Sequence, residues 1–321
     1  MKTRKTSGPF SPTTGEEGPE GNGYHRPAML RETIEALAIK SNGIYVDVTF
    51  GGGGHSREIL KYLDKSGKLV AFDQDPDAGK NAPDDDRLVF VGANFRYIHH
   101  WLCRLGIEKV DGILADLGVS SHQFDSPERG FSLRFEAGLD MRMDRKRPRN
   151  AADILNHYTA RQLTEILATY GEVDKPARVA DVLIRNRPID TTTQLNSILE
   201  SMAPAGKTHK FFAQVYQALR MEVNEELQVL QELLDQCKTI LRPDGRLVVI
   251  SYHSLEDRMV KHYMKSGNAE GKQERDFFGN LIRPFEPVNS KAMVPSDEEI
   301  AANNRVRSAR MRVAFHTRQE D

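Results

Sequence analysis

The chain has 321 residues, and its 45 Lys and Arg nearly balance 46 Asp and Glu, which leaves a formal net charge of -1. Apolar residues make up 39% and charged residues 28%, a composition typical of globular domains rather than disordered or fibrous chains. Because no apolar run approaches the roughly 18 residues of a membrane span and the polar N-terminus lacks the apolar stretch of a secretory signal, we expect a cytoplasmic protein without a membrane partner.

Residues 1–23 are dominated by Gly, Pro, Ser, Thr and Glu, which predicts a disordered tail. Short apolar runs then alternate with helical patterns as far as residue 127. The predicted strands are residues 46–50, 69–72, 88–91 and 112–117, and the predicted helices are residues 29–39, 56–63 and 95–105. Such alternation predicts an α/β fold in which a parallel sheet has helices on both faces.

The alternation stops near residue 128, and the next segment shows helical patterns alone. These patterns lie at residues 150–157, 160–170, 175–186 and 193–202. We therefore predict that residues 128–221 form a helical insert in an α/β domain made of residues 24–127 and 222–321. The second part begins with an amphipathic helix at 221–241, followed by a strand at 247–251. A final alternating run at 310–316 predicts an antiparallel edge strand.

Two stretches carry an excess of positive charge. Residues 129–149 hold seven Lys and Arg against three Asp and Glu, and residues 305–318 hold five arginines and no acid. A solvated face is the common explanation of a single such run, whereas two runs in a balanced chain indicate a polyanion partner. Cys103 and Cys237 lie in apolar helical patterns, which predicts buried thiols, and no spacing of His, Cys and Asp resembles a metal site.

Four consecutive glycines, residues 51–54, separate the first predicted strand from a helix. Such a turn lets backbone press against an adenosine-type cofactor, and the plain alternative is a glycine-rich turn without a ligand. The dinucleotide fingerprint fits poorly, since Ser56 stands where its third glycine belongs. The first motif of Rossmann-like methyltransferases fits better, because the chain reads Asp-x-Thr-x-Gly-x-Gly from Asp47 and departs from that motif at Thr49 alone.

Polar residues follow three other predicted strands. Asp73 is placed to accept both ribose hydroxyls of an adenosine, in NAD and S-adenosylmethionine alike, and taken alone it is equally a helix cap. Asp116 lies where the strand ends of an open α/β sheet form the binding crevice, with an Asx turn as the alternative. Residues 251–258 (SYHSLEDR) face the same crevice and lack the Gly-x-Ser-x-Gly elbow of a nucleophile. We interpret them as a substrate-contact loop in which Ser254 also caps a helix through a capping box with Asp257.

These segments together resemble the MraW (RsmH) family, bacterial methyltransferases that act on N4 of a cytidine in small-subunit ribosomal RNA. The resemblance covers about residues 24–316 and is carried by residues 24–30, 49–56, 111–121 and 251–258, with further matches at 128–132, 139–144, 217–227 and 305–312. It implies a Rossmann-like class I S-adenosylmethionine-dependent methyltransferase with an all-helical insert that recognises RNA.

The resemblance also implies which residues form the site. Contacts with S-adenosylmethionine are expected from Gly53, Gly54, His55, Asp73, Phe95, Asp116 and Gln123. Asp116 is the candidate acceptor for the cytosine amine, and the alternative is that it binds only the methionine amino group. Base contacts are expected from Ser120, Ser121, His253 and Ser254, and RNA-backbone contacts from Arg142 and Arg220.

The predicted activity is methylation of N4 of a specific cytidine in the decoding region of 16S ribosomal RNA. The sequence leaves open whether free RNA or the 30S particle is the substrate, and whether the protein is a monomer or a homodimer. One alternative is an NAD-dependent oxidoreductase, which predicts a third glycine and no basic helical insert. The other is a non-catalytic RNA-binding or ribosome-assembly protein, in which loss of Asp73, Asp116 and His253 is expected.

Overall fold

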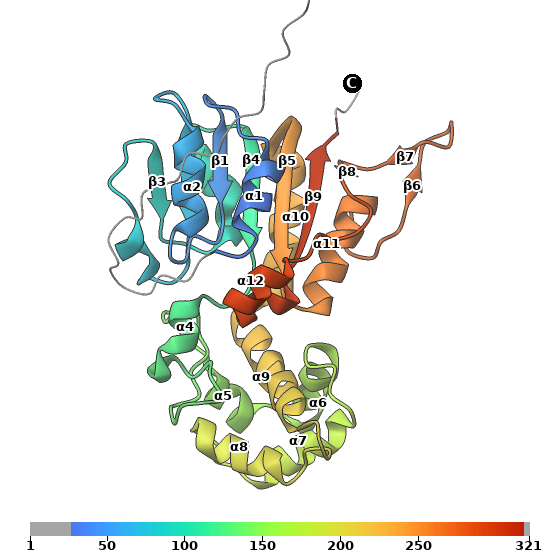
Figure 1. Cartoon of the computed structure of the whole chain (residues 1–321). Helices are drawn as coiled ribbons and strands as arrows, with labels where there is room; N and C mark the ends of the chain where they lie inside the picture. The colour runs from blue at the N-terminus through green and yellow to red at the C-terminus, as the bar shows by residue number, and fades with distance from the viewer. Residues whose placement is uncertain (1–26, 318–321) are drawn as a thin grey trace, which may run out of the picture.

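The computed structural model describes residues 27–317, so the tail predicted at residues 1–23 lies outside the described residues. Its main feature is a seven-stranded sheet with the order β3-β2-β1-β4-β5-β9-β8 (Figure 1). The strands are β1 Ile44–Asp47, β2 Lys68–Phe72, β3 Leu88–Val91, β4 Val110–Asp116, β5 Leu241–Ser251, β8 Phe285–Pro287 and β9 Arg310–His316. The first five are parallel, whereas β9 runs antiparallel to both of its neighbours.

Helices cover both faces of the sheet, as the strand–helix alternation predicts. Side chains of a strand point alternately to opposite faces, so that in β5 Leu247 and Val249 belong to one hydrophobic core and Val248 belongs to the other. The face with Val248 is covered by α1 Leu30–Leu37 and α2 Gly54–Tyr62. The opposite face is covered by α3 Ile98–Arg104, α10 Glu226–Ile240 and α11 Ser254–Ser266.

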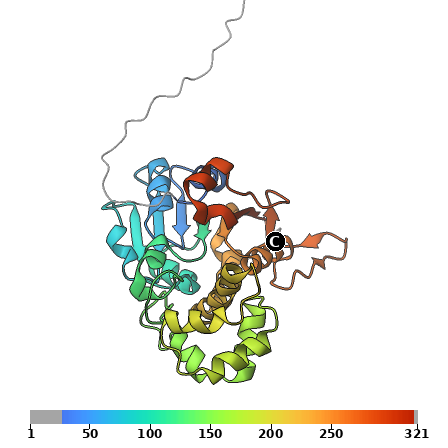
Figure 2. The ribbon, with the colours of Figure 1, turned by 60° about the horizontal axis from the view of Figure 1, so that its bottom comes forward.

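Residues 128–224, which we call the helical unit, enclose a separate hydrophobic core. The short α4 Ser121–Asp125 leads into it, and its helices are α5 Ala151–His157, α6 Ala160–Thr169, α7 Pro176–Arg185, α8 Thr192–Glu200 and α9 Thr208–Asn224. Three of them start at capping boxes formed by Asn150, Thr159 and Thr191, a local signal that explains their agreement with the sequence pattern. Figure 2 shows these helices gathered beside the sheet domain, with α9 leading back to it.

The helix predicted at residues 221–241 is two helices, α9 and α10. They meet at Glu225, whose φ of 53° lies in the left-handed region, at a cost of about 1–2 kcal/mol for a residue with a Cβ. Ion pairs of the Glu225 carboxylate with Arg96 at 2.7 Å and Arg147 at 3.1 Å stabilise this conformation. The apolar pattern continues through the break, so periodicity alone does not reveal it. The boundary predicted after residue 221 consequently falls inside α9.

Two further predictions need correction. The strand β9 is antiparallel but not at the edge, because Phe285 of β8 pairs with His316 on its outer side. The edge strand has only three residues and includes a proline, so it leaves almost no pattern. Cys237 is buried as predicted, whereas Cys103 is exposed. None of the helices within residues 27–317 combines the length and apolarity that a membrane crossing requires.

Candidate active site

The acids predicted at strand ends meet at one edge of the sheet. Because β1, β2 and β4 are parallel, Asp47, Asp73 and Asp116 all lie at their carboxyl ends. This edge faces the helical unit (Figure 1). The segment after β5 reaches the same edge, so the structure brings together the glycine turn, three acids and the segment at residues 251–258, which includes the first turn of α11.

The glycine turn is shaped by contacts inside the chain and is open at one position. Gly51 and Gly53 have φ values of 52° and 75°, which favour glycine. A Cβ at Gly53 would lie 2.6 Å from the Phe50 ring, and a Cβ at Gly54 would lie 2.2 Å from Pro27. At Gly51 the two nearest atoms would be 3.9 and 4.0 Å away. Gly51 therefore provides the side of the turn on which a ligand has room.

The side chain of Thr49 connects the segment after β1 to the end of β4. The strand β1 ends at Asp47, and the Thr49 hydroxyl accepts a hydrogen bond from the amide of Asp116 at 2.7 Å. The same hydroxyl lies 3.5 Å from an oxygen of Asp47. The departure from glycine in the methyltransferase motif thus has a structural reason, since the threonine side chain holds the backbone of Asp116.

Asp116 lies between Tyr252 and His55. The Tyr252 hydroxyl donates to Asp116 Oδ1 at 2.9 Å, and His55 Nδ1 lies 3.7 Å from Asp116 Oδ2. His55 Nε2 donates to the carbonyl oxygen of Ala28 at 3.0 Å, because a carbonyl only accepts. Burial raises the pKa of Asp116 to about 6, although His55 and Tyr252 act in the opposite direction. Tyr252 is a site residue that the sequence analysis did not single out.

Asp73 holds the glycine turn against the end of β2. Its two carboxylate oxygens accept hydrogen bonds from the amides of Gly51 and Asp75, both at 2.8 Å. Burial raises the pKa of Asp73 to about 6, although these two bonds lower it. Each oxygen keeps a second lone pair, so the carboxylate retains acceptor capacity for the hydroxyls of a ligand.

A buried ion pair between Arg129 and Asp75 joins this edge to the helical unit, and the sequence analysis missed it. The two groups are 2.7 Å apart, and their side chains are 2% and 5% exposed. Arg129 also donates to the carbonyl of Met143 at 3.1 Å. Gln123 Nε2 donates to the same Asp75 oxygen at 2.8 Å, while its Oε1 accepts from the amide of Ser120. Both ends of the Gln123 side chain therefore bind the protein.

Three of the four polar residues predicted to contact the base have partners inside the chain. Ser120 is the N-cap of α4, and Ser121 begins that helix, with a side chain outside those that the structure describes. His253, rather than Ser254, is the N-cap of α11, since its ring accepts from the amide three residues further on. The Ser254 hydroxyl instead donates to Glu172 of the helical unit at 3.1 Å.

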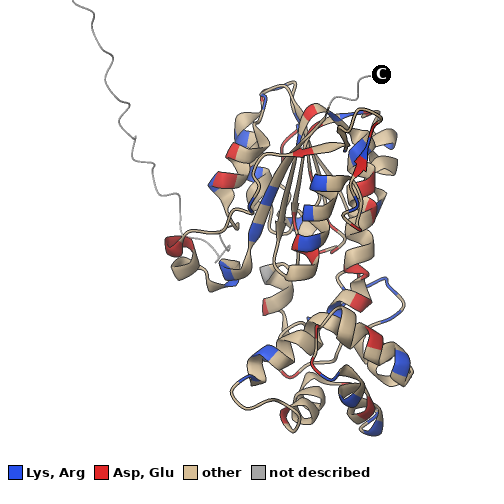
Figure 3. Ribbon diagram, turned by 90° about the vertical axis from the view of Figure 1, so that its right-hand side faces the viewer, with Lys and Arg blue, Asp and Glu red and all other residues tan. Residues whose placement is uncertain are grey.

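Lys and Arg are spread over both parts of the molecule together with Asp and Glu (Figure 3), so the pairing of each cation decides its availability. Arg142 makes two bonds to Asp140, at 2.7 and 2.9 Å. Arg220 makes two bonds to Glu226, both at 2.8 Å. The predicted RNA-contacting arginines are therefore engaged inside the chain. The exposed cations of the same region include Arg145, Lys146 and Arg149.

A cavity of about 350 Å³ lies between the helical unit and the β2–β3 side of this edge. Its lining includes Gln74, Asn94, Arg96, Tyr97, Lys146, Arg147, Arg149 and Glu225. Gln74 directly follows Asp73, and the side chains of Gln74 and Asn94 are bonded at 2.7 Å. Phe95 follows Asn94 in a single 3-10 turn and packs against the sheet core. The cavity therefore adjoins the predicted ribose and adenine contacts.

One group of side chains within the described residues has the ligand types of a metal site. Ligand atoms of Glu226, His253 and Glu256 lie within 4.8 Å of one another. However, Arg220 already binds Glu226 through two bonds, and His253 Nε2 lies 3.2 Å from Glu256. Because the cation of this cluster is supplied by the protein, we assign no metal to it.

Five parallel strands, an antiparallel β9 beside the edge strand, and a glycine turn at β1 define a Rossmann-like class I methyltransferase fold. The MraW methylase family matches residues 22–317, and the chain belongs to this family. It is 54% identical over 296 residues to a protein of Cytophaga hutchinsonii, covering 91% of this chain and 99% of that one. For proteins of Parabacteroides distasonis and Flavobacterium johnsoniae the identities are 53% and 52%, each covering 91% of this chain and 97% of the relative. All three relatives are named ribosomal RNA small subunit methyltransferase H.

Proposed function

We propose that the protein transfers a methyl group from S-adenosylmethionine to N4 of a cytidine in the decoding region of 16S ribosomal RNA. Membership of the MraW methylase family and the names of the relatives support a methyl transfer to small-subunit RNA. The observation that carries the proposal is Asp116, a partly buried carboxylate beside the glycine turn that Thr49 and Tyr252 orient.

The charges around the turn fit S-adenosylmethionine. Asp47, Asp73 and Asp116 lie at the carboxyl ends of neighbouring parallel strands, so three carboxylates are gathered in one region of the site. S-adenosylmethionine carries a sulfonium and an ammonium against one carboxylate, and so has a net positive charge. The pyrophosphate of NAD is doubly negative and would be repelled. This electrostatic difference, together with the missing third glycine, disfavours the oxidoreductase alternative.

The proposed cofactor contacts are those that the family resemblance implies, and the geometry of the turn supports them. Asp73 would accept the ribose hydroxyls through its free lone pairs, the open side of Gly51 would admit the ligand, and Phe95 would flank the adenine. Gly53, Gly54, His55 and Gln123 remain predicted neighbours of the cofactor, and in the structure they hold the turn and α4 in place. When bound, S-adenosylmethionine supplies an electrophilic methyl group.

Asp116 provides a hydrogen-bond acceptor for the exocyclic amine of cytosine. This amine is a poor nucleophile, because its lone pair is delocalised into the ring. Holding the nitrogen in the correct geometry supplies much of the acceleration, and an acceptor for its N–H favours localisation of the lone pair. The Tyr252 hydroxyl donates to Oδ1 of Asp116. Among the described residues, the nearest polar partner of Oδ2 is His55 Nδ1, at 3.7 Å. We assign the acceptor role to Oδ2.

The helical unit would recognise the RNA around the target. The base must leave its stack to reach a crevice at the strand ends, and backbone contacts then hold the flanking strand. Since Arg142 and Arg220 are paired within the chain, we assign these contacts first to the exposed Arg145, Lys146 and Arg149. The protein would act in the cytoplasm, on free RNA or on the 30S particle.

The direct test is mass spectrometry of small-subunit RNA from cells with and without the gene. Loss of cytidine N4 methylation is expected on deletion, and an unchanged level rejects the proposal. Purified protein assayed on free RNA and on 30S particles separates the remaining alternative, because a non-catalytic RNA-binding protein shows no turnover on either substrate.

A substitution separates the two roles of Asp116. Asp116→Asn should lower the transfer rate by about 10²–10³-fold, the range seen when one preorganised polar group is removed from an active site. Calorimetry with S-adenosylmethionine gives the second readout. Retained affinity identifies Asp116 as the acceptor of the amine, and lost affinity identifies it as the ligand of the methionine amino group. The exposed Asp86 provides the matched control, Asp86→Asn, for which both values should equal those of the unmodified protein.

A further inference from the structure

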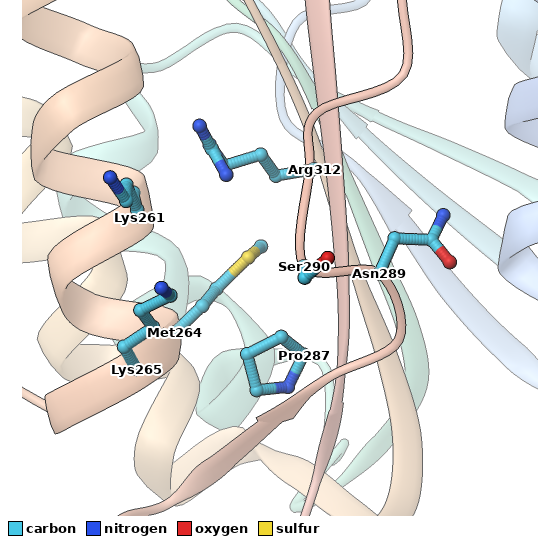
Figure 4. A pocket seen from close by; sticks show the side chains of 7 residues that line it. All are labelled: Lys261, Met264, Lys265, Pro287, Asn289, Ser290 and Arg312. Atoms are coloured by element: carbon cyan, nitrogen blue, oxygen red, sulfur yellow. The ribbon is translucent and has the colours of Figure 1, made fainter.

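A second basic site lies in the groove between α11 and β9, in the sheet domain (Figure 4). Its lining residues are Lys261, Met264, Lys265, Pro287, Asn289, Ser290 and Arg312. In Figure 4 the two lysines come from α11, and Arg312 reaches from β9 toward that helix. Among these seven residues, all in the described part of the chain, three are cations and none is an acid. The groove is therefore a candidate site for an anion.

The charges around the groove do not cancel. Arg312 is bound to Asp257 at 2.7 Å, and Arg310 approaches the same carboxylate at 3.6 Å. Neither Lys261 nor Lys265 has an ion-pair partner among residues 27–317. In and beside the groove, four cations accompany the carboxylate of Asp257, an excess of about three positive charges. A concentration of positive charge like this attracts polyanions and is weakened by salt.

The groove begins at the catalytic edge of the sheet. Arg310 lies opposite Ser251, the last residue of β5, and Arg312 lies opposite Val249, two residues further from the edge. On the other wall, α11 starts at Ser254, directly after its N-cap His253 beside the same edge, and Lys261 and Lys265 follow two and three turns later. The row of cations therefore leads away from the crevice on the β5–β9 side, whereas the exposed cations of the helical unit lie toward β2 and β3.

We propose that this groove binds a backbone phosphate of the RNA strand that flanks the target cytidine; the inference rests on the function proposed above. The cavity volume of about 10 Å³ has room for about one water-sized group, so a phosphate oxygen enters it and a base does not. Lysine and arginine bind phosphates as charges without reading sequence. The two sets of cations would then hold the strand on both sides of the flipped base.

The test compares two double variants of the full chain. In Lys261→Gln/Lys265→Gln the groove loses two charges, and in the control Lys65→Gln/Lys68→Gln two exposed charges are lost at the start of β2, the opposite end of the sheet from the crevice. Binding of a small-subunit RNA fragment is measured by fluorescence anisotropy as a function of salt. Loss of one phosphate contact to a single strand should reduce the slope of log K against log salt by about 0.7 and weaken binding about 5-fold at about 0.1 M salt.

Kinetics provide a second readout. The KM for RNA should rise about 5-fold in the groove variant, with kcat and the affinity for S-adenosylmethionine unchanged, while Lys261→Arg/Lys265→Arg should restore the KM because it keeps both charges. Equal RNA affinity and KM for the groove variant and the control would overturn the proposal. So would a change in sedimentation without a change in RNA affinity, since that outcome makes the groove an interface between copies of the chain. If the unmodified protein neither binds nor methylates the RNA, it is the proposed function that fails.

Discussion

Thr49→Val tests the link between the glycine motif and the carboxylate of Asp116. Valine keeps the shape of threonine and removes the hydroxyl that accepts from the Asp116 amide at 2.7 Å. The amide then has no partner at the end of β4. An unsatisfied buried group of this kind costs about 1–3 kcal/mol, and we expect about 1–2 kcal/mol here, because the bond is only partly buried. Asp47 loses a contact of 3.5 Å but keeps its bond to Ser56 at 2.7 Å, which adds little.

The same substitution should slow the reaction, because the amide of Asp116 positions its side chain. If about 1.4 kcal/mol of this alignment is lost in the transition state, kcat falls about 10-fold. Urea unfolding with an unchanged m-value measures the stability, and initial rates at saturating RNA measure kcat. The control is Thr49→Ser, which keeps the hydroxyl. If the valine and serine variants have the same free energy of unfolding and the same kcat, the Thr49 hydroxyl does not hold Asp116 and the explanation of the motif is wrong.

Three further predictions concern the same edge of the sheet. The rate should fall as the pH drops through about 6, because protonation removes the negative charge of Asp116 and turns one of its acceptor oxygens into a donor. Tyr252→Phe should move this limb to higher pH, since the tyrosine hydroxyl lowers the pKa of Asp116. A pH–rate profile measures both. The free energy of unfolding should change with pH in the opposite direction. Because the pKa of Asp116 is raised from 3.8 to about 6 in the folded state, its stabilising contribution is fully present below pH 3.8 and is lost as the pH rises through about 6. Gly54→Ala should destabilise the protein by about 1–3 kcal/mol through overpacking, whereas Gly138→Ala, with nothing within 4 Å of its Cβ, should not; thermal unfolding compares them. Arg129→Leu leaves its buried aspartate partner unpaired and should cost about 3–5 kcal/mol in urea unfolding.

Where local chemistry decides the structure, sequence and structure agree closely. The strands β3 and β9 occupy the predicted residues 88–91 and 310–316, because alternating or apolar β-branched residues are bounded there by turn residues. The helix α5 begins one residue after Asn150, whose capping box satisfies the first free amides of the helix. The fold class follows from such local signals and the family from the resemblance of the sequence motifs, and both are confirmed.

Where distant residues decide the structure, the pattern alone is insufficient. The break at Glu225 depends on Arg96 and Arg147, which lie far away in the chain. Arg142 belongs to a basic stretch and Arg220 lies in α9, yet each is bound to an acid, two residues away for Arg142 and six for Arg220. Charge counts along a sequence do not show which cations the fold has already paired.

The sequence by itself determined the α/β alternation, the glycine turn and the acids at the strand ends, because strand ends and turns depend on neighbouring residues. The tertiary structure alone decided that Thr49 holds Asp116, that Tyr252 and His55 flank it, and that Arg129 reaches a buried Asp75. It also decided which lysines and arginines face solvent with their charge unbalanced. Each of these outcomes depends on contacts between segments that fold together from distant parts of the chain, and hydrogen bonds and ion pairs of this kind leave no periodic trace in the sequence.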